Sequence, residues 1–393
     1  MKYKTFVMEN VLDSIIDYRG KTPKKSENGI KTLSAKSVRD GYIDYSQCYY
    51  ISKEEYDRFM VRGFPKVGDV LMTTEAPLGV LARLDRDDIA LAQRLITLRG
   101  KENVLDTGYL YYYLRSPVGQ GKIKERQTGT TVTGIKQAEF RKIEIALPSI
   151  DIQRKVASLL GVLDEKILVN KKINDNLLQQ AIVLYRELIA NNRTKGCIGD
   201  YCKVKSGFAF KSQWWRNEGV PVIKIGSINQ DQLNLSDCSF VSEDKISIAS
   251  DFTVSGGDVL IAMTGATIGK FTLVPKTTKT ILVNQRVGKF FLGDNPISRV
   301  PFIYCTLKQP DVIAEFINRG QGSAQPNISA SDIMNIPCAM PNFDVINKFN
   351  EKTSPLFELI INNQYENTLL AQLRDNLLPR LMSGEVDVSD LEL

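Results

Sequence analysis

The chain repeats itself at about half its own length. The segment ALPSIDIQRKV at 146–156 returns as AMPNFDVINKF at 339–349, and from about residue 128 to 188 the two copies align without a gap at a shift of 193 residues. Further upstream, the tetrapeptide GDVL recurs after 189 residues. A period this long is too large for a solenoid repeat, so the sequence predicts two tandem copies of a whole domain, each followed by a helix.

Each copy begins with short strands and turns. DVLMTT, RLITLRG and IEIAL in the first copy, and PVIKIG, DVLIAM and TILVNQRVGKFFL in the second, are rich in β-branched residues and bounded by glycine or proline. DTGYLYYYLRSP and RVPFIYCTLKQP predict short helices that end before a proline. The expected class is α/β, more strictly α+β, because strands and helices do not alternate regularly as in a Rossmann sheet. In chain order we expect a globular unit at 1–150, a central helix at 151–192, a second globular unit at 193–343, a distal helix at 344–385 and a tail at 386–393.

The helix after each proline carries a stripe with alternating spacings of three and four residues, the pattern of a coiled-coil seam. In the first helix the stripe consists of Leu160, Leu163, Ile167, Asn170, Asn174, Leu177, Ala181, Leu184 and Leu188. In the second it consists of Thr353, Leu356, Ile360, Asn363, Asn367, Leu370, Arg374, Leu377 and Leu381. The central residues of both stripes, at 163–177 and 356–370, are the predicted helix-pairing residues. Asp151 and Asp344 fall near the first turns, where a carboxylate favours the positive end of the helix dipole.

Each seam contains two asparagines at equivalent positions. A buried polar residue in a seam costs stability and fixes register and orientation. An antiparallel pair would place Asn170 opposite Asn367 and Asn174 opposite Asn363, although a parallel pair would also match asparagine with asparagine. Connectivity favours the antiparallel arrangement, since a helix of ~40 residues is about 60 Å long and would hold one globular unit at each end with pseudo-two-fold symmetry. The alternative is that each helix packs only on its own domain.

Several classes of function are excluded by composition. The chain has no histidine, which excludes Ser–His and Cys–His nucleophilic pairs, HNH-type nuclease sites and histidine-based metal sites. None of its six cysteines forms a CxxC pair, so neither a zinc ribbon nor a thioredoxin-type motif is present. The net charge of +6 permits a polyanionic partner. No apolar run is long enough for a membrane span and no signal-peptide pattern is seen, so cytoplasmic residence is expected.

Two short motifs suggest catalysis but lack what the chemistry needs. GATIGK at 265–270 is one residue short of a phosphate-binding loop, and Phe271 stands where a serine or threonine must bind magnesium. The tripeptide Glu243-Asp244-Lys245 has no convincing upstream aspartate strand to complete a nuclease site. We therefore predict no catalytic residue and no metal ligand.

The repeat plan and several segments resemble a known family. Two diverged α/β units, each followed by a long helix, together with SGFAFKS at 206–212, GDVLIAMTGATIG at 257–269, VNQRVG at 283–288 and LLPRLMSGEVDV at 377–388, are similar to the specificity subunit of type I restriction–modification systems. The resemblance covers nearly the whole chain. The first unit has TTEAPLG where the second has the TGATIG form, so its assignment rests on the repeat.

The resemblance implies a non-catalytic subunit that scaffolds a larger complex. Each globular unit would be a target-recognition domain for one half of a bipartite, asymmetric DNA sequence, and the helices would set the separation of the halves, which is roughly 34–36 Å for sites one turn of B-DNA apart. Two modification subunits carrying S-adenosylmethionine would dock on the helices. Two restriction subunits would add ATP-driven, Mg²⁺-dependent translocation and cleavage, and the chain itself would hold no cofactor. Two alternatives remain open: a self-contained nuclease or methyltransferase with recognition domains, and a duplicated protein-binding scaffold without DNA specificity.

Candidate DNA contacts come from three kinds of position. The basic clusters RGKTPKK and KSGFAFKSQWWR, at the start of each unit, supply the phosphate contacts Lys21, Lys24, Lys205 and Lys211, while Trp214 and Trp215 are expected to serve packing. The repeated pairs Gln93-Arg94 and Gln285-Arg286 suit base readout, since Arg can grip guanine and Gln adenine, although a shared structural role is equally open. Loops supply the remaining candidates: Thr74, Thr130, Thr131, Lys136, Thr264, Thr267, Lys270, Ser323, Gln325 and Asn327. The glycine-led loop before the last strand differs between the copies, as loops that read different half-sites must.

Overall fold

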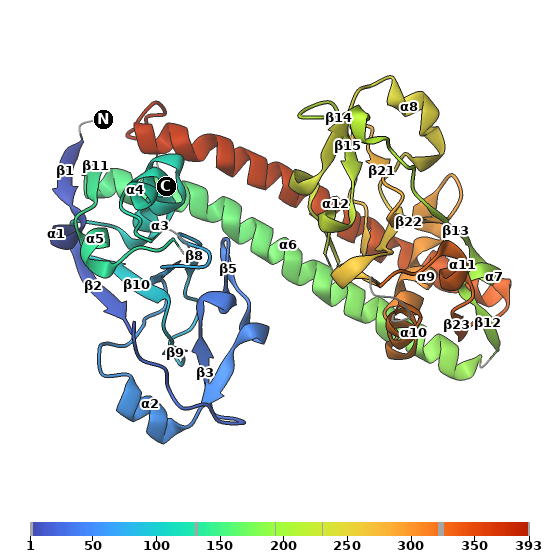
Figure 1. Cartoon of the computed structure of the whole chain (residues 1–393), viewed down its shortest axis with the longest axis horizontal. Coiled ribbons are helices and arrows are strands. Elements are labelled where there is room, and N and C mark those ends of the chain that lie inside the picture. Colours follow the sequence, from blue (N-terminus) through green and yellow to red (C-terminus); the bar gives the residue numbers. More distant parts are fainter. Residues whose placement is uncertain (1–2, 130–132, 193, 230, 321–325, 392–393) are drawn as a thin grey trace. The chain divides into compact units, whose positions relative to one another are not determined.

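The computed structural model describes residues 3–129, 133–192, 194–229, 231–320 and 326–391. Contacts divide the chain into two compact units: unit 1 comprises Met1–Glu165 and Leu370–Leu393, and unit 2 comprises Lys166–Leu369 (Figure 1). Each unit therefore combines one globular repeat with a part of each long helix. The sequence-based division treats each long helix as a segment separate from the globular units. The contacts instead divide each long helix between the two units.

The elements of unit 1 are short, apart from its share of the long helices. Its strands are β1 Lys4–Val7, β2 Leu12–Asp17, β3 Ile30–Leu33, β4 Val38–Arg39, β5 Tyr42–Ile43, β6 Tyr49–Ile51, β7 Val70–Thr73, β8 Leu81–Arg83, β9 Ala90–Leu91, β10 Leu95–Gly100 and β11 Glu144–Leu147. Its helices are α1 Met8–Val11, α2 Lys53–Phe59, α3 Thr107–Arg115, α4 Pro117–Glu125 and α5 Gln137–Arg141.

Unit 2 follows the same plan. Its strands are β12 Lys195–Cys197, β13 Lys203–Ser206, β14 Trp215–Arg216, β15 Val220–Ile223, β16 Ile228–Asn229, β17 Gln232–Leu233, β18 Ser239–Val241, β19 Val259–Ala262, β20 Phe271–Leu273, β21 Leu282–Val283, β22 Val287–Phe291 and β23 Pro337–Ala339. Its helices are α7 Ile198–Tyr201, α8 Lys245–Ile248, α9 Val300–Leu307, α10 Pro310–Gly320 and α11 Ala330–Met334.

The two globular repeats share one sheet topology. Unit 1 has a four-stranded sheet in the order β2-β10-β7-β8, and unit 2 has one in the order β13-β22-β19-β20. All pairs in both sheets are antiparallel, with Leu98 opposite Val70 in unit 1 and Phe290 opposite Val259 in unit 2. A separate parallel pair, β3 with β9, also recurs as β15 with β21. The predicted duplication and the mixed α/β class are confirmed.

One predicted strand is interrupted. The segment TILVNQRVGKFFL contains β21 and β22, separated by a turn at 284–286, because the chain changes sheets there: β21 pairs with β15, and β22 pairs with β19. The N–H of Val287 donates to the carbonyl of Asn284 at 2.9 Å and closes the turn. This interruption leaves Gln285 and Arg286 exposed.

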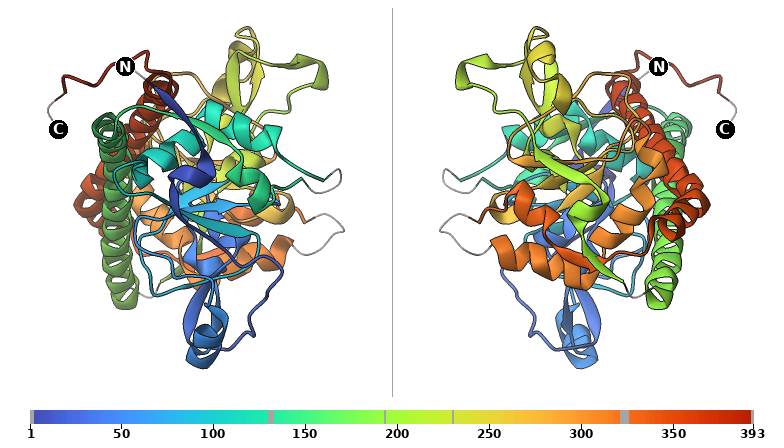
Figure 2. Two further views of the ribbon diagram at one scale, coloured as in Figure 1. Left: turned by 90° about the vertical axis from the view of Figure 1, so that its left-hand side faces the viewer. Right: turned by 90° about the vertical axis from the view of Figure 1, so that its right-hand side faces the viewer.

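Helices α6 (Ile150–Asn191) and α12 (Phe343–Ser383) lie side by side and run in opposite directions (Figure 2). Asn170 Nδ2 donates to Asn367 Oδ1 at 2.9 Å, and Asn363 Nδ2 donates to Asn174 Oδ1 at 2.8 Å. From the first pair to the second, the residue number rises along α6 and falls along α12. The two helices therefore run antiparallel, as predicted. Neither helix, nor any other among the described residues, is both long and apolar enough to cross a membrane.

Both long helices also pack on the globular repeats. α6 supplies Leu160 to the core of unit 1 and Tyr185 to the core of unit 2, and α12 supplies Leu381 and Phe357 in the same way. The Tyr185 hydroxyl is hydrogen-bonded to Thr306 Oγ1 at 2.9 Å. Packing on the repeats, considered above as an alternative to helix pairing, therefore accompanies it.

Removing one amide of the coiled coil tests its energetic role. Asn170 is 1% exposed, so Asn170→Ala leaves the Asn367 amide oxygen without the hydrogen bond that Asn170 donates. We expect the free energy of unfolding to fall by about 1–3 kcal/mol in a denaturant titration. Asn176→Ala, at an exposed position of the same helix, is the matched control and should change it by less than about 0.5 kcal/mol. Equal effects of the two substitutions would contradict a structural role for the amide pair.

Candidate nucleic-acid interface

In unit 2, three segments meet through backbone hydrogen bonds at the end of β19. The N–H of Met263 donates to the carbonyl of Arg286 at 3.0 Å, and the N–H of Ile328 donates to the carbonyl of Met263 at 2.9 Å. Thr264 and Asn327 form a β-bridge. We call residues 262–270, 285–286 and 326–328 the loop junction of unit 2. It brings together the predicted contacts Thr264, Thr267, Lys270, Gln285, Arg286 and Asn327.

Unit 1 contains the same arrangement. The N–H of Thr74 donates to the carbonyl of Arg94 at 3.0 Å, and the N–H of Ile135 donates to the carbonyl of Thr74 at 2.9 Å. Glu75 and Gly134 form the matching β-bridge. Residues 73–80, 93–94 and 134–136 form the loop junction of unit 1, which brings together the predicted contacts Thr74, Gln93, Arg94 and Lys136.

The hydrogen bonds correct the alignment of TEAPLG with TGATIG. That alignment makes Thr74 the counterpart of Thr264, whereas the bonds make Thr74 the counterpart of Met263, at a shift of 189 residues. At the other end of the loop, the N–H of Gly79 donates to the carbonyl of Thr73, and the N–H of Gly269 donates to the carbonyl of Ala262. These two glycines are related by a shift of 190 residues. The shift grows from 189 to 190 across the loop, so the loop of unit 2 is one residue longer. Thr74 is 2% exposed and does not suit a direct DNA contact.

The two repeated arginines differ in their surroundings. Arg94 Nε lies 2.7 Å from Glu75 Oε1, in an ion pair whose arginine side chain is 55% exposed. Arg286 is exposed, and its guanidinium makes no hydrogen bond or ion pair with another residue that the structure describes. The difference follows from the loop sequence, because uncharged Thr264 takes the place of Glu75.

The lysines predicted as phosphate contacts lie on segments next to the loop junctions. Lys21 and Lys24 are exposed after β2, and Lys205 and Lys211 are exposed on and after β13. Lys205 Nζ lies 4.9 Å from the ring centroid of Phe291, and Lys211 Nζ lies 5.4 Å from that of Trp214. Aromatic rings thus contact the ammonium groups of these two lysines, whose side chains stay exposed.

The two tryptophans pack in an aromatic cluster. Trp214 stacks on Phe208 with a centroid separation of 6.2 Å, and Trp215 lies 5.6 Å from Phe210. Phe208 connects this cluster to the loop junction of unit 2, because its carbonyl accepts from the N–H of Gln285 at 3.0 Å. Both indoles pack within this cluster, as expected, and their side chains are half-buried.

Arg19 is a candidate that sequence reasoning missed. Its Nη2 donates to the carbonyl of Ile135 at 2.9 Å and attaches the RGKTPKK cluster to the loop junction of unit 1. In the equivalent sheets of the two units, Asp17 lies opposite Ile96 and Ser206 lies opposite Gly288, so Asp17 and Ser206 are counterparts. Arg19 and Phe208 each come two residues later and therefore occupy equivalent positions. Alignment of the two strand ends would have revealed this equivalence.

The remaining predicted contacts lie before the last strand of each repeat. Lys136 is exposed at the N-cap of α5, and Asn327 is exposed before α11. Four further candidates lie outside the described residues: Thr130, Thr131, Ser323 and Gln325.

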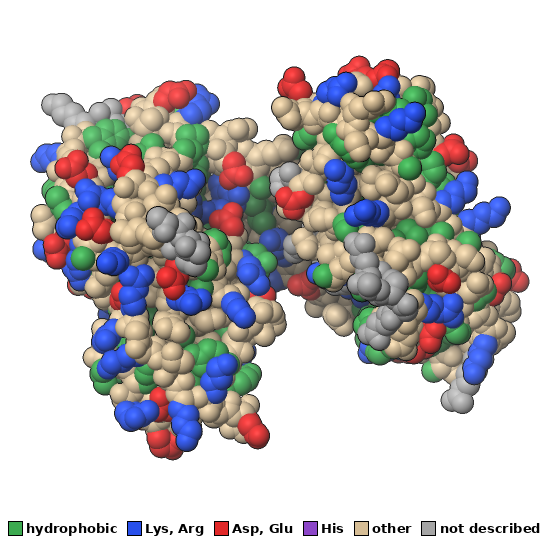
Figure 3. Space-filling model, viewed as in Figure 1, with side chains coloured by type: hydrophobic (Ala, Val, Ile, Leu, Met, Phe, Trp, Pro, Cys, Tyr) green, Lys and Arg blue, Asp and Glu red, His purple; other side chains and the backbone are tan. Residues whose placement is uncertain are grey.

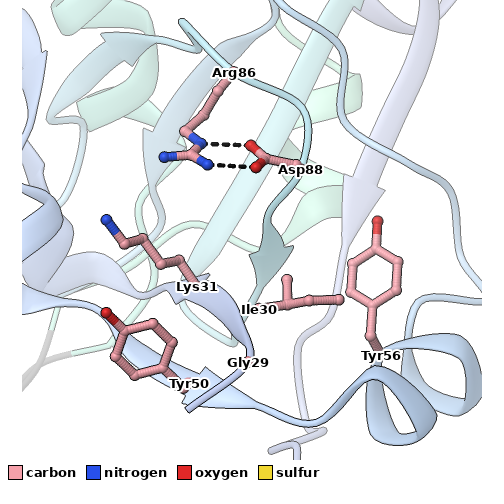
Figure 4. Close-up of a pocket in the computed structure, with 7 residues that line it drawn as sticks. All are labelled: Gly29, Ile30, Lys31, Tyr50, Tyr56, Arg86 and Asp88. Carbon is pink, nitrogen blue, oxygen red and sulfur yellow. Dashed lines mark hydrogen bonds and ion pairs between the residues drawn. The ribbon is translucent and has the colours of Figure 1, made fainter.

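Unit 1 also has a surface pocket of about 410 Å³, lined by Gly29, Ile30, Lys31, Tyr50, Tyr56, Arg86 and Asp88 (Figure 4). Arg86 and Asp88 form a two-bonded ion pair in this pocket. Lys31 and Arg86 both lie over the ring of Tyr45, at 5.6 and 5.7 Å from its centroid. Because Asp88 neutralises Arg86, the pocket has little net positive charge, and we assign no DNA contact to it.

Charges of both signs are interspersed on the face of each unit seen in Figure 3. Within the described ranges, no group of three or more Cys, Asp or Glu side chains could hold a metal ion. No single basic patch stands out among the described residues on the face seen in Figure 3, so the candidate DNA surface is marked by individual side chains of the loop junctions and their neighbouring lysines.

The sequence profile of a family described as the type I restriction modification DNA specificity domain matches residues 7–179 and 192–373. The chain belongs to this family. The type I restriction enzyme MjaIX specificity subunit of Methanocaldococcus jannaschii is 25% identical over 366 residues, which cover 87% of this chain and 82% of the relative. The MjaVIII specificity subunit of the same organism is 21% identical over 325 residues, or 77% of this chain and 75% of the relative.

The fold is shared with a solved member of the family. The crystal structure of the type I restriction–modification S subunit from M. genitalium covers 97% of this chain and 96% of its own, with a TM-score of 0.56 and 18% identity. The two profile matches coincide with the two copies found in the sequence. The chain is the specificity subunit of a type I restriction–modification system, and the catalytic activities belong to its partner subunits. The interpretations as a self-contained enzyme or as a scaffold without DNA specificity are set aside.

Arg286 provides a direct test of the candidate interface. We expect Arg286→Ala to weaken specific DNA binding by the complex with cognate modification subunits roughly ten- to hundredfold, because a bidentate Arg–guanine contact discriminates by about 1–3 kcal/mol. Arg286→Lys keeps the charge but loses the planar fork, so it should retain the salt dependence and lose base preference. Binding is measured on cognate and base-substituted duplexes. An Arg286→Ala variant with unchanged preference at every base would remove Arg286 from the interface.

Proposed function

We propose that each unit reads one half of a bipartite, asymmetric DNA target through its loop junction. The observation that carries this proposal is that one backbone hydrogen-bond framework occurs in both units but displays different side chains. Unit 1 presents Glu75 and Arg94 as an ion pair. Unit 2 has Thr264, whose hydroxyl is buried, on a loop one residue longer, and an exposed Arg286 whose guanidinium has no partner among the described residues. Side chains at base edges carry sequence information, so different displays suit different half-sites.

Flanking lysines would position the duplex without reading it. Lys21 and Lys24 in unit 1, and Lys205 and Lys211 in unit 2, are exposed next to their loop junctions. Cations at such positions contact phosphates and contribute affinity that falls with salt concentration. In each unit the loop junction would thus read bases, and the flanking lysines would bind phosphates.

The paired helices support the docking of catalytic partners. Apolar side chains remain exposed along them: Val162, Leu168, Val169, Ile173 and Val183 on α6, and Phe343, Leu359, Leu369 and Leu373 on α12. Exposed apolar residues gathered on a helix pair are typical of a protein–protein interface. We assign this surface to two modification subunits, which would carry S-adenosylmethionine. Two restriction subunits would join the complex and supply ATP- and Mg²⁺-dependent activity.

Methylation mapping tests the proposed target. The chain is combined with its cognate modification subunits, S-adenosylmethionine and a library of randomised duplexes, and the methylated duplexes are sequenced. We expect two short conserved blocks separated by a spacer of fixed length and unspecified sequence. A single block, or no block, would contradict readout by two units.

A length change in both helices tests whether they set the spacer. We propose inserting seven residues between Asn170 and Asn174 and seven between Asn363 and Asn367, because a whole heptad preserves the seam. Seven residues add about 10 Å of helix, or about three base pairs. Both blocks should remain and the spacer should lengthen. The control replaces the same helix segments without changing their length. An unaltered spacer in a folded insertion variant would contradict the proposal that helix length sets the spacer.

A further inference from the structure

The asparagine pairs set the register of the coiled coil but do not select its partner. Asn170 and Asn174 recur after 193 residues as Asn363 and Asn367, so α6 and α12 offer the same two amides. An antiparallel pair of α6 with a second copy of α6 would match Asn170 with Asn174 and allow the same amide–amide bonds. It would lose only the bond that Asn170 also donates to the half-exposed Glu366, whose counterpart on α6 is Ile173. A feature that is not repeated must therefore make α6 pair with α12.

The ion pair between Asp164 of α6 and Arg374 of α12 is such a feature. Arg374 Nη1 lies 2.6 Å from Asp164 Oδ1, and the two side chains are only 14% and 28% exposed. Asp164 Oδ2 accepts a hydrogen bond from the Tyr112 hydroxyl at 2.7 Å and lies 3.7 Å from Arg115 Nη1. The cluster connects both helices to α3 inside unit 1.

The equivalent positions in unit 2 carry no charge. The shift of 193 residues relates Asp164 to Phe357 and Ala181 to Arg374, so the counterpart of the ion pair is Ala181 with Phe357. Both are fully buried in the core of unit 2. The seam residues of the two helices were paired above by the shift of 193 residues. Ala181 and Arg374 form the one such pair whose members differ in charge.

We infer that the Asp164–Arg374 pair selects the helix partner, favouring α6 with α12 and disfavouring pairs of like helices from two copies of the chain. In an α6–α6 pair Asp164 would face Ala181, and in an α12–α12 pair Arg374 would face Phe357. Each of these arrangements loses the ion pair across the helices, although Asp164 keeps Tyr112 and Arg115 and Arg374 keeps Asp375. The loss of this partly buried pair disfavours both arrangements relative to α6 with α12.

A second ion pair between the helices contributes little to this selection. Lys166 Nζ lies 3.6 Å from Glu366 Oε2, but the two side chains are 48% and 44% exposed. Water and salt screen such a pair, so its removal changes the preference only slightly. Where the proposed function holds, the selection by Asp164 and Arg374 also keeps the target asymmetric, because like-with-like pairing would join two identical readers.

A pair of added cysteines reports like-with-like pairing in the full chain. With the register set by the amides, Ile167→Cys of one α6 lies opposite Leu177→Cys of a second α6. Within one helix the two positions are about 15 Å apart, beyond the reach of a disulfide. A disulfide-linked dimer after refolding at micromolar concentration and oxidation therefore reports α6–α6 pairing, and the chain without the added cysteines gives the background from native thiols.

Two variants remove the selection in different ways. Asp164→Phe with Arg374→Ala copies the residues of unit 2, and Arg374→Ala alone leaves Tyr112 and Arg115 as partners of Asp164, so unit 1 keeps a satisfied carboxylate. We expect each to increase the linked dimer at least fivefold over the wild-type background carrying the same cysteines. Lys166→Gln, which removes the exposed ion pair and leaves Glu366 bonded to Asn170, is the matched control and should change the yield less than twofold.

The outcomes separate this inference from the proposed function. Arg374→Ala protein that is folded by circular dichroism but gives the wild-type dimer yield would overturn partner selection, as would a control that matches the two variants. Neither result bears on methylation mapping of the unmodified chain, which tests the two half-sites independently.

Discussion

Two hydrogen-bonded pairs of asparagine amides between α6 and α12, each with one buried and one half-buried member, constrain how the two long helices pair. A buried amide must find a partner or lose the hydrogen bonds that it made with water. The observed pairs, Asn170 with Asn367 and Asn174 with Asn363, satisfy the amides in the antiparallel direction and fix the register. That direction places the start of α6 with the end of α12 in unit 1, and the reverse in unit 2, which is why each unit contains parts of both helices.

Sharing the helices gives each globular repeat a larger core than it would have alone. Leu160 and Leu381 complete the core of unit 1, and Tyr185 and Phe357 complete that of unit 2. The repeats use different chemistry at equivalent places, with Asp164 bonded to Tyr112 and Arg374 in unit 1 and the apolar Phe357 in unit 2. Both solutions obey one rule, because a buried charge is tolerated where it is paired and an apolar side chain needs no partner.

The sequence predicted the elements whose signal is long and periodic. The repeat, the two long helices and the amide pairing follow from spacings sustained over tens of residues. The prediction of a single strand at 280–292 was wrong because a three-residue turn moves the chain between two sheets, and no periodicity marks such a change. Thr74 was misassigned because a one-residue difference in loop length is invisible where TEAPLG and TGATIG look alike, while hydrogen bonds to Arg94 and Ile135 reveal it.

The loop junctions share one backbone framework, which would let them serve two different targets as proposed above. Their defining hydrogen bonds join backbone atoms, so side chains at the surface can change without loss of the framework. The two arginines illustrate the consequence. Glu75 orients the guanidinium of Arg94 and reduces the side-chain entropy lost on binding, but it also neutralises the charge. Arg286 has no such ion pair with a described residue, so under the proposed readout unit 2 would gain attraction to DNA at the cost of orientation, and the two units would differ in mechanism as well as in base preference.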